Sequence, residues 1–209
     1  MPRYPTRSWR AFDPGAAPAA RSAPVVRLTP VAKARILGLD PGSRRTGYGL
    51  IECTGGNNTQ LAHGCIATAG ATLAQRLRQI FEGVQALIER YQPDEVAIER
   101  VFVNRNVDSA LKLGHARGAA LCAVPTAMPV FEYAPRAIKL AIVGFGGAEK
   151  TQVAHMIRAV LNVQGRLSAD ASDALAVAVC HAHTRRVHAL TGAATAVVTL
   201  RSSVPGRAR

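Results

Sequence analysis

The sequence predicts an α/β fold with a five-stranded mixed sheet flanked by helices. Three strand-like segments come first in the folded part, and helical and strand-like segments then alternate. A helix lies between the third and fourth strands, so we expect the fourth strand to run parallel to the first. With 209 residues, the chain is long enough for one domain with a full core, and it contains no internal repeat.

Asp40 stands at the end of the first predicted strand. We expect strands at residues 35–41, 46–53 and 60–68, arranged as a meander, with a sharp glycine-rich turn after Asp40. An acid in this place would be presented to solvent on a rigid scaffold and would not be buried in the sheet. The neighbouring glycines would leave room beside it for a bulky partner such as a phosphate.

Glu99 repeats this arrangement at the end of the fourth predicted strand. A capping-box pattern at residues 72–75 begins an amphipathic helix that Pro93 ends, and a short apolar strand at 96–99 follows. If that strand is parallel to the first, Glu99 and Asp40 lie at the same edge of the sheet. The further predicted elements are a helix at 108–123, a strand at 129–133, and helices at 135–143 and near 153–161.

The last predicted helix opens with two acids, Asp170 and Asp173, which share one face because they are three residues apart. One interpretation is helix capping, with Asp170 as the N-cap and Asp173 as its reciprocal partner. The other is a site shared with Asp40 and Glu99. Two carboxylates about 4 Å apart repel by roughly 4 kcal/mol at an effective dielectric constant of 20, so such a group needs divalent cations. Ligands that are all oxygen favour Mg²⁺ or Mn²⁺ over zinc.

The formal net charge of +13 is concentrated at the two ends of the chain. Residues 1–35 carry a net charge of +6, residues 184–209 carry +5, and the segment between them carries only +2. We expect residues 1–34 to be a disordered basic extension rich in Pro, Ala and Arg, residues 35–183 to form the folded domain, and residues 184–209 to be a basic, flexible tail. The extension is a non-specific DNA-binding arm, an inert segment or the result of a wrongly assigned start codon.

The basic composition makes nucleic acid the first candidate partner, ahead of a membrane surface. No apolar segment approaches the roughly 18 residues of a membrane helix, and the N-terminus lacks the apolar part of a secretory signal. The four cysteines form no CxxC pair, and we expect them to be small buried hydrophobic residues in a reducing compartment. These features predict a cytoplasmic protein without a membrane partner.

Several motifs together resemble the RuvC family of Holliday-junction resolvases, in order and in spacing. They are DPGS at 40–43 and TGYG at 46–49, AIE at 97–99 and VF at 101–102, DSALKLG at 108–114, AEK at 148–150, and ADASDALA at 169–176. The resemblance extends from about residue 35 to 183 and implies a ribonuclease-H-like fold. It also implies a homodimer that binds four-way DNA junctions in recombination and DNA repair. Such a dimer nicks two opposing strands symmetrically, leaves 5′-phosphate and 3′-hydroxyl ends, and works with the RuvA and RuvB branch-migration proteins.

The resemblance further implies roles for individual residues. The catalytic acids, which would bind two Mg²⁺ ions with Mn²⁺ as a substitute, are Asp40, Glu99, Asp170 and Asp173. Phe102 would stack on a junction base, and Lys139 and Lys150 would lie near the scissile phosphate. Without the family, a core position explains Phe102 equally well, and the two lysines are explained as solvated helix charges.

The helix expected at 108–123 contains Gly114 and Gly118, which cost roughly 1 kcal/mol each relative to alanine. Such a cost suggests close approach to another helix, within the subunit or across a dimer, and the resemblance places this helix at the dimer interface. Arg100 and His115 stand where the family has glutamine. Adjacent side chains on a strand point to opposite faces, so Arg100 need not touch the metal ions and could instead contact a phosphate or alter the cleavage-sequence preference.

Three other function classes match parts of the pattern. A sugar-kinase or actin-like ATPase also has a glycine-rich hairpin with an acid, but it needs two such lobes and this chain is too short. A non-catalytic junction-binding protein would lack one of the acids, and all four are present. A nuclease of the same fold that acts on RNA–DNA hybrids or RNA precursors shares these residues, and substrate assays separate it from a resolvase.

Overall fold

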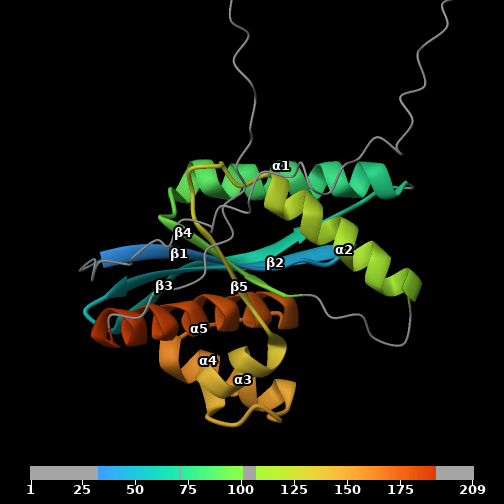
Figure 1. Cartoon of the computed structure of the whole chain (residues 1–209). Helices are drawn as coiled ribbons and strands as arrows, with labels where there is room; N and C mark the ends of the chain where they lie inside the picture. Colours follow the sequence, from blue (N-terminus) through green and yellow to red (C-terminus); the bar gives the residue numbers. More distant parts are fainter. Residues whose placement is uncertain (1–32, 71, 101–106, 192–209) are drawn as a thin grey trace, which may run out of the picture.

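The structure is a computed structural model that describes residues 33–70, 72–100 and 107–191. The strands are β1 (Lys33–Asp40), β2 (Arg45–Thr54), β3 (Asn57–Ala67), β4 (Glu95–Glu99) and β5 (Val130–Tyr133), and the helices are α1 (Leu73–Tyr91), α2 (Val107–Cys122), α3 (Pro135–Val143), α4 (Lys150–Leu161) and α5 (Ala169–Thr191). In Figure 1 the sheet lies between two layers of helices, with α1 and α2 on one face and α3, α4 and α5 on the other. Phe102 lies outside the described residues, as does most of the basic extension expected at 1–34.

The five strands form one mixed sheet in the order β3-β2-β1-β4-β5. The β1–β2 and β2–β3 pairs are antiparallel, whereas the β1–β4 and β4–β5 pairs are parallel. This topology confirms the predicted meander, the parallel fourth strand and the ribonuclease-H-like fold class. β1 lies at the centre, and its apolar residues on both faces are buried, as expected for a strand covered by helices on both sides.

Helix α5 lies directly on the sheet because glycines face it. A Cβ atom at Gly47 would lie 2.0 Å from the backbone oxygen of Asp170, and one at Gly38 would lie 2.2 Å from that of Ala174. No side chain fits at either position unless the helix moves away. The helix backbone therefore occupies the space that the glycines near Asp40 were expected to leave for a phosphate, and that expectation is wrong.

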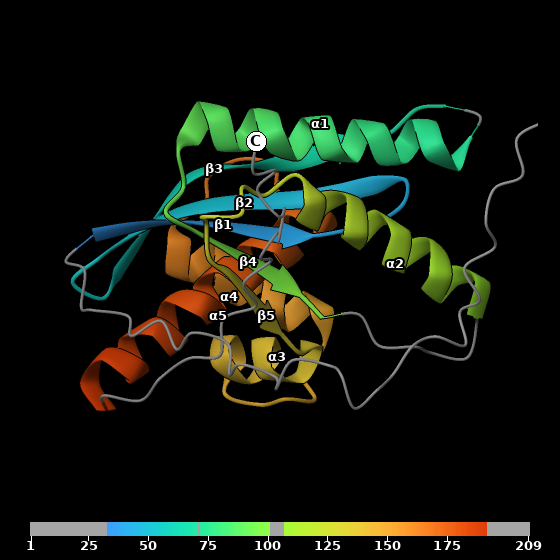
Figure 2. The ribbon, with the colours of Figure 1, turned by 45° about the horizontal axis from the view of Figure 1, so that its top comes forward.

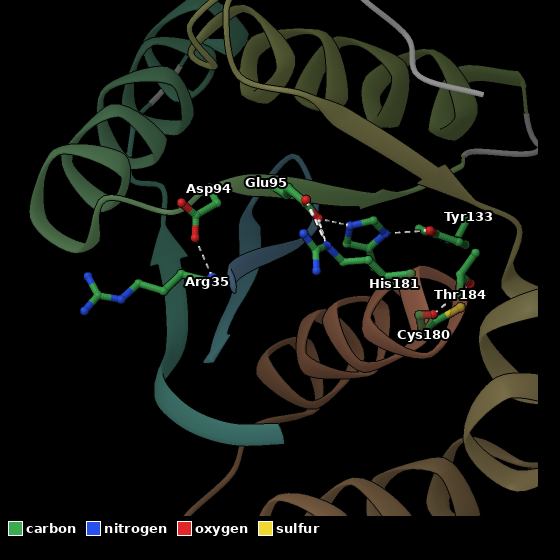
Figure 3. Close-up of polar contacts among 8 residues, drawn as sticks. Arg35, Asp94, Glu95, Tyr133, Cys180, His181 and Thr184 are labelled. Carbon is green, nitrogen blue, oxygen red and sulfur yellow. Dashed lines mark hydrogen bonds and ion pairs between the residues drawn. The ribbon is translucent and has the colours of Figure 1, made fainter. Parts of the chain in front are cut away.

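Helix α5 also runs past residue 184, where we expected a flexible tail to begin. Arg185 accounts for the difference, because it is buried and its Nε donates to both carboxylate oxygens of Glu95 at 2.9 and 2.8 Å. Glu95 Oε2 also lies 2.6 Å from His181 Nε2, and His181 Nδ1 lies 2.6 Å from the Tyr133 hydroxyl oxygen (Figure 3). These four residues, the Glu95 cluster, join α5 to β4 and β5. An arginine that resembled part of a solvated tail instead completes a buried ion pair.

Helix α2 leaves its two glycines open. A Cβ atom at Gly114 or Gly118 would have no atom within 4 Å, so no other helix among the described residues approaches them. The second half of α2 packs through buried Ala116 and Ala120, while its first half extends away from the sheet (Figure 2). The within-subunit explanation for the glycines is therefore wrong for the described part of the chain.

The four cysteines are free. We expected all four to be buried, and this expectation is wrong for three of them. Cys180 is buried, Cys53 and Cys65 are partly buried, and Cys122 is exposed at the end of α2. No helix in the described ranges is both long enough and apolar enough to span a membrane.

Candidate active site

The site is built on the ends of two neighbouring parallel strands. Asp40 is the last residue of β1 and Glu99 is the last residue of β4, and the preceding residues, Leu39 and Ile98, are paired in the sheet. The two acids therefore lie side by side at one edge, and their carboxyl groups share a hydrogen bond. The strand pairing that brings them together is the one that the sequence predicted.

Both carboxyl groups hold their protons unusually well. Burial raises the pKa of Asp40 to about 6, repulsion from Asp173 and Asp170 adds to the rise, and Lys150 opposes it. Burial likewise raises the pKa of Glu99 to about 7, with Asp40 and Asp173 adding to the effect. Asp40 is thus half-buried and not presented to solvent, which corrects our expectation.

Asp170 and Asp173 reach this edge from the first turns of α5. The backbone N–H of Ala171 donates to Ser168 Oγ at 3.3 Å, so Ser168 is the capping residue and the capping interpretation of Asp170 is wrong. Each acid instead contacts a cation: Asp170 Oδ2 lies 2.8 Å from Arg45 Nε, and Asp173 Oδ2 lies 2.8 Å from Lys150 Nζ. The repulsion that both acids exert on Asp40 shows that they lie within electrostatic reach of the strand-end pair.

A cleft of about 200 Å³ opens beside the strand-end acids. Its lining combines two acids with two lysines and an apolar wall, formed by Glu99, Asp173, Lys139, Lys150, Pro135, Ile138, Val153 and Ala176. The lysines come from α3 and from the start of α4, so the structure brings both of them to the same cleft as Glu99. A negatively charged group in this cleft would meet both lysines and both acids.

Arg100 lies apart from this cleft. Its Nε is 3.7 Å from Glu132 Oε2, and Glu132 also pairs with Arg117 of α2. Glu132 is paired with Ile98, the residue before Glu99, and adjacent residues of a strand point to opposite faces. The side chains of Glu132 and Glu99 therefore lie on opposite faces of the sheet. The Arg100 side chain is 54% exposed on the α2 face. His115 is exposed on α2 as well.

The donor chemistry of the site fits a divalent metal ion, although the side chains are not gathered around one point. In the described ranges, no three His, Cys, Asp or Glu side chains are grouped closely enough to hold a metal ion. The acids nevertheless offer only oxygen ligands, as Mg²⁺ and Mn²⁺ prefer. Burial and, after it, repulsion from the neighbouring acids raise the pKa values of Asp40 and Glu99, and a bound cation would offset both effects. Binding would require Asp170 and Asp173 to turn away from Arg45 and Lys150.

Sequence reasoning missed Arg45 and Ser168. The position of Arg45 was readable, because it begins the strand that returns from Asp40, but its partner Asp170 lies far along the chain. Ser168 stands directly before the helix, which is a standard capping position. From the sequence we considered only Asp170 as the N-cap, because two acids follow closely at 170 and 173.

Comparisons with known proteins agree with this arrangement. The family model for crossover junction endodeoxyribonuclease RuvC matches residues 36–181. The RuvC protein of Shewanella sp. (strain W3-18-1) is 56% identical over 163 residues, which cover 77% of this chain and 94% of that protein. The protein of the same name from Shewanella sediminis (strain HAW-EB3) is 57% identical over 150 residues, covering 71% and 87%. The solved structure of T. thermophilus RuvC in complex with Holliday junction substrate is similar with a TM-score of 0.69 and 32% identity, covering 75% of this chain and 97% of that chain.

Proposed function

The chain belongs to the RuvC family of crossover junction endodeoxyribonucleases, and we propose that it resolves four-way DNA junctions in recombination and DNA repair. The observation that carries this proposal is the pair of strand-end acids, Asp40 and Glu99, with Asp170 and Asp173 within reach on α5. The likeness to T. thermophilus RuvC, which was solved with a Holliday junction substrate, supports the choice of DNA substrate.

We also propose that the activity depends on divalent metal, and the same four acids support this. Asp40, Glu99, Asp170 and Asp173 would hold Mg²⁺, with Mn²⁺ as a substitute, and their number suits two ions per site. When bound, the ions would activate the attacking water and neutralise the departing 3′-oxygen, which leaves 5′-phosphate and 3′-hydroxyl ends.

The basic side chains of the cleft would position the phosphate. Lys150 places its ammonium group beside the acids, and Lys139 lines the same cleft from α3. Phosphate contacts of this kind supply affinity without base readout, so junction shape would be selected mainly through the backbone. We assign base preference at the cut to Phe102 and the residues next to it in the sequence, and a more distant phosphate contact to Arg100.

Paired symmetric nicks require two active sites, and α2 supports a homodimer. Its first half exposes Val107 (65%) and Leu111 (58%), and the open glycines Gly114 and Gly118 continue the same stripe. A stripe of apolar and small residues at helical spacing is suited to close contact with a second copy. We place this dimer in the cytoplasm, where reducing conditions suit its free cysteines, and expect it to act with RuvA and RuvB.

A cleavage assay tests the proposal. The protein is incubated with Mg²⁺ and a synthetic mobile four-way junction, in parallel with linear duplex DNA, an RNA–DNA hybrid and ATP. We expect paired symmetric nicks on the junction alone. Hybrid cleavage without junction cleavage, or turnover of ATP, would overturn the proposal.

The variant Asp40→Asn separates chemistry from binding. It should abolish detectable cleavage, because the amide cannot supply the anionic oxygen with which Asp40 would help to hold the divalent ions. Junction affinity, measured by gel shift, should stay within about twofold, since most affinity comes from phosphate contacts elsewhere. Cleavage by Asp40→Asn at the wild-type rate would show that the metal ligands have been assigned wrongly.

A further inference from the structure

Asp170 is held by a side chain that the proposed mechanism does not use. Arg45, the first residue of β2, places Nε 2.8 Å from Asp170 Oδ2. The thiol of Cys65 on β3 lies 3.6 Å from the same oxygen, and an Arg45 guanidinium nitrogen lies 3.5 Å from the Cys65 sulfur. Two side chains from the β2–β3 hairpin therefore contact one oxygen of an acid that the metal ion would need.

The position of α5 places Asp170 between Asp40 on one side and the β2–β3 hairpin on the other. The α5 backbone lies over Gly47, because a Cβ atom at Gly47 would lie 2.0 Å from the backbone oxygen of Asp170. In the sheet, Gly47 is paired with Asp40 of β1 and with Cys65 of β3. From there the carboxylate can turn toward Asp40 on β1 or toward Arg45 and Cys65 on the hairpin. The structure has it on the hairpin, while its charge still acts on Asp40.

The Arg45–Asp170 pair contributes little to folding. The Arg45 side chain is 57% exposed and that of Asp170 is 35% exposed, and pairs of this kind are worth no more than about 1 kcal/mol. A divalent cation, with its higher charge, can also separate such an exposed ion pair easily. The pair therefore matters mainly for metal binding, because the Arg45 guanidinium and a divalent ion would compete for the Asp170 carboxylate.

We propose that Arg45 is a positioning residue that holds Asp170 on the β2–β3 side and competes with the divalent cation for its carboxylate. This inference rests on the proposed function, because it requires Asp170 to be a metal ligand. Arg45 then lowers the affinity of the site for metal, and the ion must displace the guanidinium before Asp170 can join the other acids.

Metal titration by calorimetry on the full chain tests this inference without measuring cleavage. Mn²⁺ is titrated into metal-depleted wild type, Arg45→Gln and Arg45→Lys. We expect Arg45→Gln to bind Mn²⁺ about three- to tenfold more tightly, as removing one positive charge a few ångströms from the ion predicts. Arg45→Lys keeps the charge and should remain within about twofold of wild type.

Arg44→Gln is the matched control. Arg44 is the preceding residue, is exposed and, in the described ranges, forms no ion pair with an acid, so this variant removes the same charge without freeing Asp170. It should bind Mn²⁺ within about twofold of wild type. Equal tightening in Arg44→Gln and Arg45→Gln, or weaker binding by Arg45→Gln, would overturn the role of Arg45.

Asp40→Asn separates this inference from the proposed function. If Asp40→Asn loses Mn²⁺ binding while Arg45→Gln matches Arg44→Gln, the metal site stands and only the role of Arg45 fails. If Asp40→Asn binds Mn²⁺ as wild type does, the metal site itself is wrong and both proposals fail.

Discussion

At the residue scale, the raised pKa values of Asp40 and Glu99 predict a specific dependence of stability on pH. Their native pKa values are about 6 and about 7, against ordinary values of 3.8 and 4.5. The native state therefore binds more protons than the unfolded state within this window. Stability should fall as the pH rises from about 4 to about 7, and the loss should be complete above that range.

Asp40→Asn should remove part of this loss. Without divalent metal at pH 8, the variant should unfold with a free energy on the order of 1–2 kcal/mol higher than wild type, and the gain should be smaller at pH 5. Urea unfolding with EDTA at the two pH values measures it. Glu82→Gln, an exposed acid on α1, is the control and should show no such gain. If Asp40→Asn gains no stability at pH 8, burial and the neighbouring acids do not destabilise the ionised Asp40 carboxylate.

Particular residues show what the sequence could predict about the site. The acids at the ends of two strands were identified because strand direction follows from the order of elements, and Glu99 does lie beside Asp40. The burial of Asp40 was not predictable, because it depends on α5 lying on Gly47, a contact between distant parts of the chain. The same distance hid the pairing of Asp170 with Arg45.

At the element scale, the Glu95 cluster should fix α5 on β4 and β5. Burial alone would raise the pKa of Glu95, but His181 and Arg185 outweigh it and hold that pKa below its ordinary value. The cluster therefore stabilises the protein at neutral pH and loses this contribution as the pH falls below about 4.5. Glu95→Ala should cost about 3–5 kcal/mol at pH 7, because it leaves the Arg185 guanidinium buried without a carboxylate.

Two comparisons make that prediction specific. The double variant Glu95→Leu with Arg185→Leu removes both charges and should be clearly more stable than Glu95→Ala, since an apolar pair avoids the unpaired buried charge. Glu82→Ala, which breaks an exposed pair with Arg78, should cost less than about 1 kcal/mol. Urea unfolding of the variants ranks them. A cost for Glu95→Ala no larger than that for Glu82→Ala would contradict a structural role for the cluster.

The cluster also explains why the end of α5 could not be predicted. Arg185 and Arg186 follow the apolar part of the helix and resemble the start of a solvated basic tail. The buried carboxylate of Glu95, far away in the sequence, anchors this turn on the sheet through Arg185. The start of α5 was easier to predict than its end, because Asp170 and its neighbours directly precede a continuous apolar segment.

At the scale of the whole molecule, the order of the elements was predictable and the partner of α2 was not. The meander, the crossover helix and the parallel strands follow from hydrophobic periodicity and the handedness of crossovers. The glycines of α2 indicated close approach to a helix, but no helix in the described part of the chain takes that place. We propose a second copy as this partner, because it would give two cleavage sites related by symmetry, as paired nicks require.

Leu111→Arg tests this assembly, because it puts a charge in the middle of the exposed α2 stripe while adding no negative charge that would repel DNA. We expect the variant to be monomeric by analytical ultracentrifugation at concentrations at which wild type is a dimer, because each interface would have to bury two charged arginines in an apolar stripe. It should keep its fold and lose paired nicking of the junction. Val160→Arg, at an exposed apolar position on α4, is the control and should remain dimeric. A dimeric Leu111→Arg, or a monomeric wild type that still makes paired nicks, would show that α2 does not form the interface.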